Sequence, residues 1–193
     1  MAARIPDAVK TLELFNEKAD QLLASSFLDE VSGGGAIVRF DRESGWDGIF
    51  VGPDDESMRA LILTLRMFMQ DNERISLRNM AALYDSLSVS AVVKREFDER
   101  RSVLNTSLDS ESPLAITEDG PLSYREILST FVYGEHAHVA ARHRQTYEDL
   151  RTTPFFPLFQ NCLVDAIVAL ARCIGVMRDV NRRAIAELTS LES

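Results

Sequence analysis

Residues 162–177 read CLVDAIVALARCIGVM, and this is the most apolar stretch of the chain. It is shorter than the roughly 20 residues that a membrane-spanning helix needs, and Asp165 and Arg172 interrupt it. We therefore expect a buried core helix that begins near Pro157, since proline is favoured in a first turn, and ends near Leu188. The expected fold is built around this helix.

The two cysteines of the chain, Cys162 and Cys173, lie eleven residues apart on that helix. Their separation along the axis is about 16 Å, too far for a disulfide bond. We expect both thiols to be free and buried, which fits a reducing compartment. The first twenty residues contain no apolar core of signal-peptide length. The sequence therefore predicts a cytoplasmic protein without a membrane partner.

The helix before the core helix has the clearest start signal in the chain. Ser123 and Glu126 have the spacing of a capping box, and Leu122 and Ile127 occupy the two positions of a hydrophobic staple. This pattern predicts a helix that starts at Ser123 and continues to about Arg151.

Four earlier segments carry apolar residues at helical spacing. The second has an apolar stripe that is widened by Leu63, which predicts burial on most sides, and the third can be capped by Ser76. The four expected helices are about Asp7–Leu28, from Asp54 or Asp55 to about Met69, Ser76–Tyr84 and Ser90–Leu108.

A β-hairpin is expected between the first and second helices, at about residues 36–51. Ala36, Val38 and Phe40 alternate with other residues, and a polar loop then leads to a second apolar run. An isolated hairpin is marginally stable, so we expect Val38 and Phe40 to pack on the helices. The predicted fold class is mainly α: one domain over residues 1–193, with about six helices in a bundle and this small hairpin.

Composition excludes several classes of function. The 193 residues include 21 Lys and Arg against 30 Asp and Glu, a net charge of −9, which argues against a general nucleic-acid coat. Two cysteines cannot form a disulfide scaffold or, alone, a structural zinc site. The sequence contains no phosphate-binding loop and no Gly-x-Ser-x-Gly motif.

Several polar residues occupy positions that the helical period assigns to the core. Arg66 and Arg101 lie on apolar stripes, Asn105 follows Arg101 by four residues, and His138 lies on the line of Phe131. Buried polar groups are normally partnered, so we predict that Arg66, Arg101, Asn105 and His138 meet in space. Alternatively, the stem of Arg66 packs while its head reaches water or a carboxylate, and Arg101 forms a structural ion pair.

The segment around His138 carries the remaining candidate residues. Glu135, His138 and Arg142 form a polar stripe at spacings of three and four, and Tyr133 adds a phenol. Arg142, His143 and Arg144 make the densest positive cluster, which is either a solvated face or a phosphate-contacting surface. We keep Glu135, Arg142, His143 and Arg144 as candidate binding residues, and His138 and Tyr133 as candidate catalytic residues beside Arg66, Arg101 and Asn105.

The same segment bears on metal binding. Glu135-x-x-His138 has the spacing of a di-iron ligand pair, but a complete site needs a second pair on another helix. The only histidines are His136, His138 and His143, so one chain cannot supply it. A zinc site from Glu135, His136 and His143 has poor geometry. We expect no metal and no cofactor.

These segments resemble a group of bacterial helical proteins to which no activity is assigned. Its pattern is Arg-x-Phe-x-Gln-Asp-Asn-Glu, then Arg-x-x-Leu-Asn, then Phe-x-Tyr-Gly-x-x-Ala-His. The matching residues here are Arg66, Phe68, Gln70, Asp71, Asn72 and Glu73, then Arg101, Leu104 and Asn105, then Phe131, Tyr133, Gly134, Ala137 and His138.

More loosely, a bundle with Arg and His inside is similar to the HEPN superfamily of small helical domains. Its RNA-cleaving members carry an Arg with a His four to six residues later, usually completed across a dimer. Here Arg142 follows His138 instead of preceding it. Two main functions therefore stay open, beside small-molecule binding in the bundle. One is a helical interaction or regulatory domain that self-associates or binds a protein. The other is a divergent HEPN-like ribonuclease or RNA-binding protein of a bacterial defence or toxin system.

Overall fold

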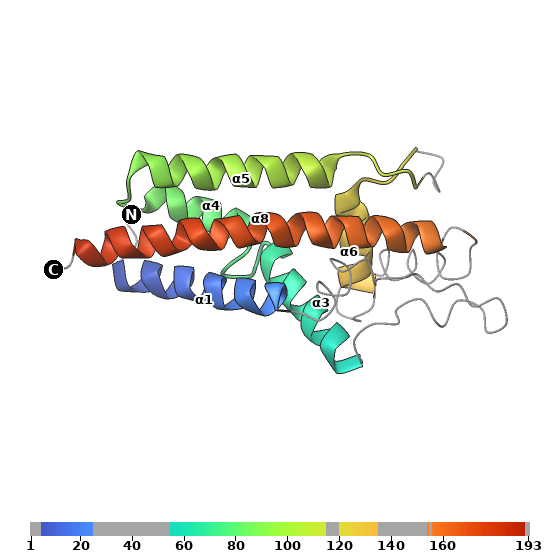
Figure 1. Cartoon of the computed structure of the whole chain (residues 1–193), viewed down its shortest axis with the longest axis horizontal. Helices are drawn as coiled ribbons and strands as arrows, with labels where there is room; N and C mark the ends of the chain where they lie inside the picture. Colours follow the sequence, from blue (N-terminus) through green and yellow to red (C-terminus); the bar gives the residue numbers. More distant parts are fainter. Residues whose placement is uncertain (1–4, 25–54, 115–119, 135–153, 155, 192–193) are drawn as a thin grey trace. The chain divides into compact units, whose positions relative to one another are not determined.

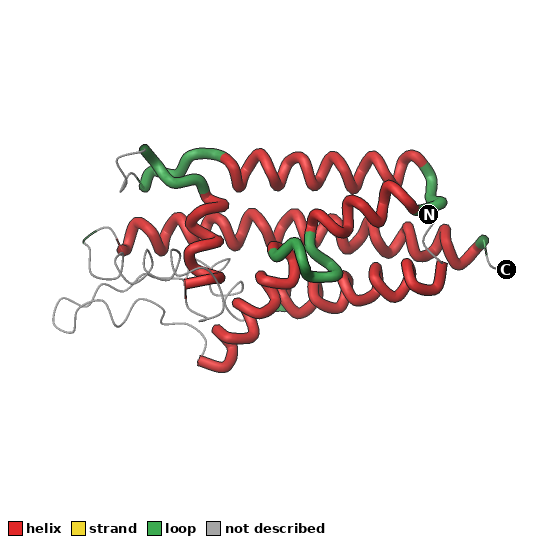
Figure 2. The backbone as a smooth tube through the Cα atoms, turned by 180° about the vertical axis from the view of Figure 1, so that it is seen from behind, coloured by secondary structure: helices red, strands yellow, loops and turns green. Residues whose placement is uncertain are grey.

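A computed structural model describes residues 5–24, 55–114, 120–134, 154 and 156–191 of the chain. Within these ranges the backbone is mainly helical, as predicted, and contains six helices (Figure 1). No strand occurs among the described residues, and Figure 2 shows only helices and connecting loops there. The helices are α1 (Ile5–Leu23), α3 (Asp55–Met69), α4 (Leu77–Ser86), α5 (Ala91–Asp109), α6 (Tyr124–Gly134) and α8 (Phe156–Ser190).

The chain divides into two compact units, which are described separately. Unit 1 is drawn from Met1–Ala24, Leu61–Leu104 and Ala171–Ser193, and unit 2 from Ser25–Ala60 and Asn105–Leu170. The long helix α8 contributes its first half to unit 2 and its second half to unit 1.

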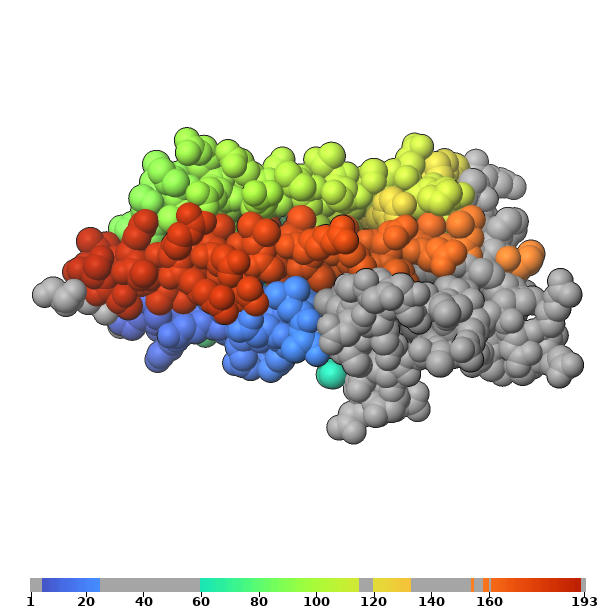
Figure 3. All heavy atoms as spheres, in the orientation of Figure 1, coloured from blue at the N-terminus to red at the C-terminus, as the bar shows by residue number. Residues whose placement is uncertain are grey.

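In unit 1 the second half of α8 lies between α1 and α5 (Figures 1 and 3). Each helix buries a single apolar stripe, as the helical periods predict. The rings of Phe15 on α1 and Phe68 on α3 meet edge to face with 5.1 Å between centroids, a favourable aromatic arrangement. Buried core residues of unit 1 include Leu12, Phe15, Ile62, Leu65, Phe68, Met80, Tyr84, Val93, Phe97, Leu104, Ile174, Met177, Ala184 and Leu188.

The turn between α3 and α4 is fixed by side chains that bond to its backbone. The Asn79 amide donates to the carbonyls of Asp71 and Glu73 at 2.8 and 2.7 Å. The Ser76 hydroxyl accepts from the Asn79 backbone N–H and caps α4, as predicted. Arg74 ties the turn to α1 by donating from Nε to the Thr11 hydroxyl at 2.8 Å.

In unit 2, α6 begins with the predicted capping box. The Ser123 backbone N–H donates to the Glu126 carboxylate at 2.8 Å, and the Glu126 N–H donates back to the Ser123 hydroxyl at 3.2 Å. The apolar face of α6 and the first half of α8 form a core. Its buried residues include Leu108, Leu114, Ile127, Leu128, Phe131, Val132, Phe159, Leu163, Ala166, Ile167 and Leu170.

Two short segments that lead into α6 pair in antiparallel fashion. Glu111 and Ser123 form a β-bridge, and the Ser112 N–H donates to the Leu122 carbonyl at 2.9 Å. Gly120 adopts φ +111°, a conformation that side-chain-bearing residues rarely adopt. These bonds set where the chain enters α6.

The remaining predictions on the fold have mixed outcomes. The helices starting near Asp55, Ser76, Ser90 and Ser123 are confirmed, and α8 ends two residues beyond the expected Leu188. The hairpin at residues 36–51, with Val38 and Phe40, and the stretch from Glu135 to Arg151 lie outside the described residues. Among the helices that the structure describes, none combines the length and apolar character needed to cross a bilayer.

Candidate functional site

Two of the predicted site residues, Arg66 and Arg101, bond to residues close to them in the sequence. Arg66 is half-buried at the end of α3, and its Nη2 donates to Gln70 Oε1 at 3.5 Å. Arg101 on α5 donates from Nη2 to Asp98 Oδ1 at 3.3 Å, and 38% of its side chain is exposed. Arg101 thus forms an ion pair with Asp98 between two partly exposed side chains, a kind of pair that contributes little to stability.

Asn105, in unit 2, is joined to a residue that the sequence did not single out. Its Oδ1 accepts a hydrogen bond of 2.9 Å from Nη2 of Arg125 on α6. Nε of the same guanidinium donates to Asp109 Oδ1 at 2.5 Å. Arg125 thus connects the last turn of α5 to the first turn of α6 within unit 2.

The predicted site around His138 lies outside the described residues, together with Glu135, Arg142, His143 and Arg144. Tyr133 is the penultimate residue of α6, and its side chain is likewise outside the described part. The meeting of Arg66, Arg101, Asn105 and His138 therefore stays a prediction.

The most deeply buried polar contact in unit 1 joins Tyr84 on α4 to Asn181 on α8. The Tyr84 hydroxyl donates to Asn181 Oδ1 at 2.7 Å, and the two residues are 2% and 0% exposed. The Tyr84 ring stacks on Phe97 with 4.0 Å between centroids. Among the described residues, Asn181 Nδ2 has no hydrogen-bond partner. A buried amide with one unsatisfied half is costly, so its retention calls for a structural or functional reason.

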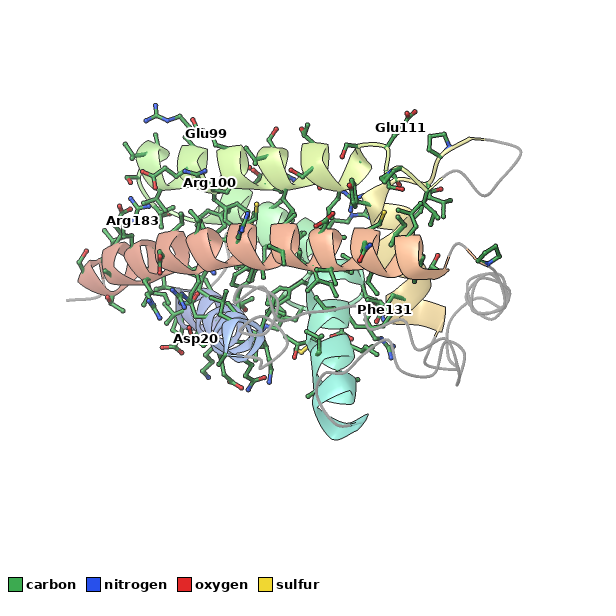
Figure 4. All side chains as sticks on the ribbon, turned by 45° about the vertical axis from the view of Figure 1, so that its right-hand side comes forward. Asp20, Glu99, Arg100, Glu111, Phe131 and Arg183 are labelled. Atoms are coloured by element: carbon green, nitrogen blue, oxygen red, sulfur yellow. The ribbon has the colours of Figure 1, made fainter. Side chains whose placement is uncertain are left out.

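Two further polar contacts surround this pair and also connect α8 to α5. The Glu187 carboxylate accepts from the Ser90 backbone N–H at 2.6 Å and from the Ser90 hydroxyl at 2.8 Å. Both Nη atoms of Arg183 donate hydrogen bonds to the Glu96 carboxylate, one of them at 3.2 Å (Arg183 is labelled in Figure 4). The Tyr84–Asn181 cluster is defined here as Tyr84, Ser90, Glu96, Asn181, Arg183 and Glu187.

The pKa values of Tyr84 and Glu96 are shifted by their surroundings in this cluster. Burial raises the pKa of the Tyr84 phenol far above its usual value, and the nearby Glu187 raises it further, although Arg183 opposes the shift. The hydrogen bond from Arg183 lowers the pKa of the Glu96 carboxyl. Tyr84 therefore stays a protonated hydrogen-bond donor and Glu96 a paired anion at neutral pH.

In unit 2 the buried thiol of Cys162 lies near two polar side chains, Ser112 and Asp165. Burial raises the pKa of the Cys162 thiol, and the nearby Asp165 raises it further, although a hydrogen bond with Ser112 opposes the shift. Burial also raises the pKa of Cys173 in unit 1, which is half-buried where the sequence predicted full burial. A thiol with a raised pKa is a poor nucleophile at neutral pH.

The Tyr84–Asn181 cluster was missed in the sequence, although one signal points to it. Asn181 lies on the same helical face as Met177, Ala184 and Leu188, which are all buried. The criterion that selected Arg66 and Arg101, a polar residue on an apolar stripe, also selects Asn181. Arg182 and Arg183 beside it give the segment a surface-like composition that hides this position.

Within the part of the chain that the structure describes, no group of three or more His, Cys, Asp or Glu side chains is placed to hold a metal ion. Comparison with protein-family models, with curated proteins and with solved structures finds no match to this chain. The resemblances drawn from short sequence patterns therefore stay predictions.

Proposed function

We propose that this chain is a non-catalytic helical interaction domain that works as a dimer. The observation that carries the proposal is that polar side chains in unit 1 form hydrogen bonds with other parts of the same unit. Tyr84 and Asn181 bond to each other between α4 and α8, and Glu187 on α8 accepts from Ser90, the residue before α5. Side chains committed in this way stabilise a fixed arrangement of helices, which is what a binding scaffold requires.

The charged groups of α8 support the same function. Arg183 pairs with Glu96 on α5, and Arg178 donates to Asp20 on α1 at 2.6 Å. Asp20 also lies 3.6 Å from Nη2 of Arg182. Exposed ion pairs contribute little each, but together they connect both neighbours of α8 and favour one packing arrangement.

The outer surface supplies what a scaffold of this kind would bind with. Large aliphatic side chains on three helices are between 39% and 54% exposed, and α5 also exposes charged side chains such as Arg95 and Glu99. Interfaces of non-obligate complexes have this mixture of apolar and polar area. The exposed residues are Leu63 on α3, Val92 and Val103 on α5, and Val176 on α8.

The test is directed at the alternative function, RNA cleavage by His138 with Tyr133 and an arginine. Purified protein is incubated with total RNA without metal ions, beside the His138→Ala variant, and the melting temperatures of both are recorded. We expect intact RNA with both proteins. If His138 is a satisfied core residue, the variant loses about 1–3 kcal/mol of stability, because its partners stay buried without it.

Cleavage by the wild type alone, with equal melting temperatures, would replace the proposed function by a ribonuclease. The molar mass in solution is measured on the same samples by light scattering. A monomer at all concentrations would refute the dimeric state.

A further inference from the structure

The outward side of α5 carries two valines on one line. Val92 and Val103 are 48% and 50% exposed. They are eleven residues apart, which is about three helical turns, so both side chains leave the helix in nearly the same direction. Half-exposed valines are the poorest residues to leave in water on a helix that otherwise exposes charges.

Arg95 and Glu99 lie between the two valines on the same side of the helix. Arg95 Nε is 3.8 Å from a Glu99 carboxylate oxygen, and the two side chains are 67% and 64% exposed. Glu99 lies on the side of α5 away from α8, whereas Arg100 lies on the side toward α8 (Figure 4). The outer face of α5 is defined here as Val92, Arg95, Glu99 and Val103.

This face is complementary to itself in one orientation. When two copies of α5 run antiparallel, Val92 of one copy can lie opposite Val103 of the other, and the reverse contact follows by symmetry. In that register the level of Arg95 along the helix axis differs from that of Glu99 in the second copy by one residue, which is about 1.5 Å. Both valine contacts and both Arg–Glu contacts therefore form together.

The parallel alternative is disfavoured by charge. It would bring Arg95 against Arg95 and Glu99 against Glu99 of the second copy, and like charges at an interface select against that arrangement. In the antiparallel register Glu96 falls level with Glu99 of the second copy, but Arg183 already binds the Glu96 carboxylate. The repulsion there is therefore reduced.

We propose that the outer face of α5 binds a second copy of this chain in an antiparallel, two-fold arrangement. This rests on the proposed function, since it names the partner and the surface of the dimer. A single pair of helices buries an area at the low end of specific interfaces, less than about 1,200 Å², so the dimer is weak and reversible. Its affinity falls as salt is raised, because exposed charges are screened.

The experiment exchanges the two charges one at a time. Arg95→Glu makes positions 95 and 99 both negative, and Glu99→Arg makes them both positive. We expect each variant alone to dissociate at least tenfold more readily than the wild type in sedimentation equilibrium. When the two variants are mixed, both contacts between position 95 of one chain and position 99 of the other become attractive, so a heterodimer should form more tightly than either variant alone.

Two controls keep the result decisive. Arg172→Glu changes the same charge on an exposed position of α8 and should leave the dimer unchanged, and circular dichroism checks that each variant keeps its helices. If a charge reversal fails to fold, Arg95→Gln and Glu99→Gln take its place with a smaller expected loss. A wild-type dimer that neither single variant weakens would overturn the α5 contact and leave the proposed function standing, whereas a wild-type monomer would overturn both.

Discussion

The hydroxyl of Tyr84 donates a hydrogen bond of 2.7 Å to Oδ1 of Asn181 across 97 positions of sequence. It joins the short helix α4 to the second half of α8 inside the core of unit 1. The stacked ring of Phe97 holds the phenol from the side of α5. Three helices therefore meet around one tyrosine, and the pair can be tested by removing either member.

Tyr84→Phe should lower the free energy of unfolding by about 1–3 kcal/mol, because it leaves the buried Asn181 carbonyl without its donor. Urea unfolding followed by circular dichroism measures this loss. Asn181→Leu should also destabilise, since it leaves the phenol unpaired. The double variant should lose less than the two single losses added together, because no buried polar group is then left alone. Strict additivity would show that the hydrogen bond contributes nothing.

The Glu96–Arg183 pair predicts a dependence of stability on pH. The pKa of Glu96 is lowered in the folded protein from its ordinary value of 4.5, chiefly by its hydrogen bond with Arg183. A lowered carboxyl pKa stabilises the fold above the unfolded-state pKa, and this contribution is lost as the pH falls through the folded-state pKa. The wild type should therefore exceed Glu96→Gln in stability at neutral pH, with a difference that shrinks below about pH 4.5.

Urea midpoints of both proteins between pH 7 and pH 3 measure this difference. Glu13→Gln, at an exposed position of α1, serves as the control for removing a carboxylate. A gap between the wild type and Glu96→Gln that stays constant down to pH 3 would contradict the assignment.

Ser123→Ala removes the capping box of α6. The side chain that accepts from the Glu126 N–H is lost, so stability should fall by about 0.5–2 kcal/mol. Ser102→Ala, at an exposed position inside α5, is the matched control and should change stability by less than about 0.5 kcal/mol. Thermal unfolding monitored at 222 nm compares the two. Equal effects of both substitutions would mean that the box does not stabilise α6.

Two glycines should respond in opposite directions to substitution by alanine. Gly120 has φ +111°, so Gly120→Ala should destabilise by about 1–3 kcal/mol, although no neighbouring atom lies within 4 Å of the new methyl group. Gly175 is inside α8, and a methyl group there would meet the flexible end of Leu23 at 3.4 Å. Gly175→Ala should gain up to about 1 kcal/mol from helix propensity. Chemical denaturation measures both, and a loss of stability in Gly175→Ala would show that Leu23 cannot adjust.

The helices were predictable because their signals are local. Ser76 and Ser123 mark helix starts through bonds to residues only three positions away, and both caps are present. Apolar periodicity then indicates which face is buried. The apolar pattern gave a wrong prediction at Leu63, which was expected to be buried on α3 but is 54% exposed. Leu63 lies on the side of α3 opposite Ile62 and Leu65, and apolar character alone does not bury a residue.

The polar contacts were less predictable because their partners are distant in sequence. Arg125 reaches Asn105 across 20 positions, and nothing in the composition of either segment selects that partner. The pairing of residues 110–114 with 120–124 depends on backbone bonds, while Pro113 and Pro121 interrupt any strand pattern there. Asn181 could have been found, since its helical face is otherwise apolar.

The segment of α8 from Arg178 to Glu187 has one further consequence, for the order in which unit 1 folds. Its contacts reach Asp20, Tyr84 and Glu96 across 158, 97 and 87 positions. Closing such long loops costs chain entropy before any contact compensates for it, and topologies rich in distant contacts fold slowly. The earlier helices can form their own turns, and Arg74 joins α1 to the turn before α4 without α8. The connections to Asp20, Tyr84 and Glu96 form only when this segment of α8 docks. We therefore expect its docking to be the step at which α1, α4 and α5 become one cooperative structure.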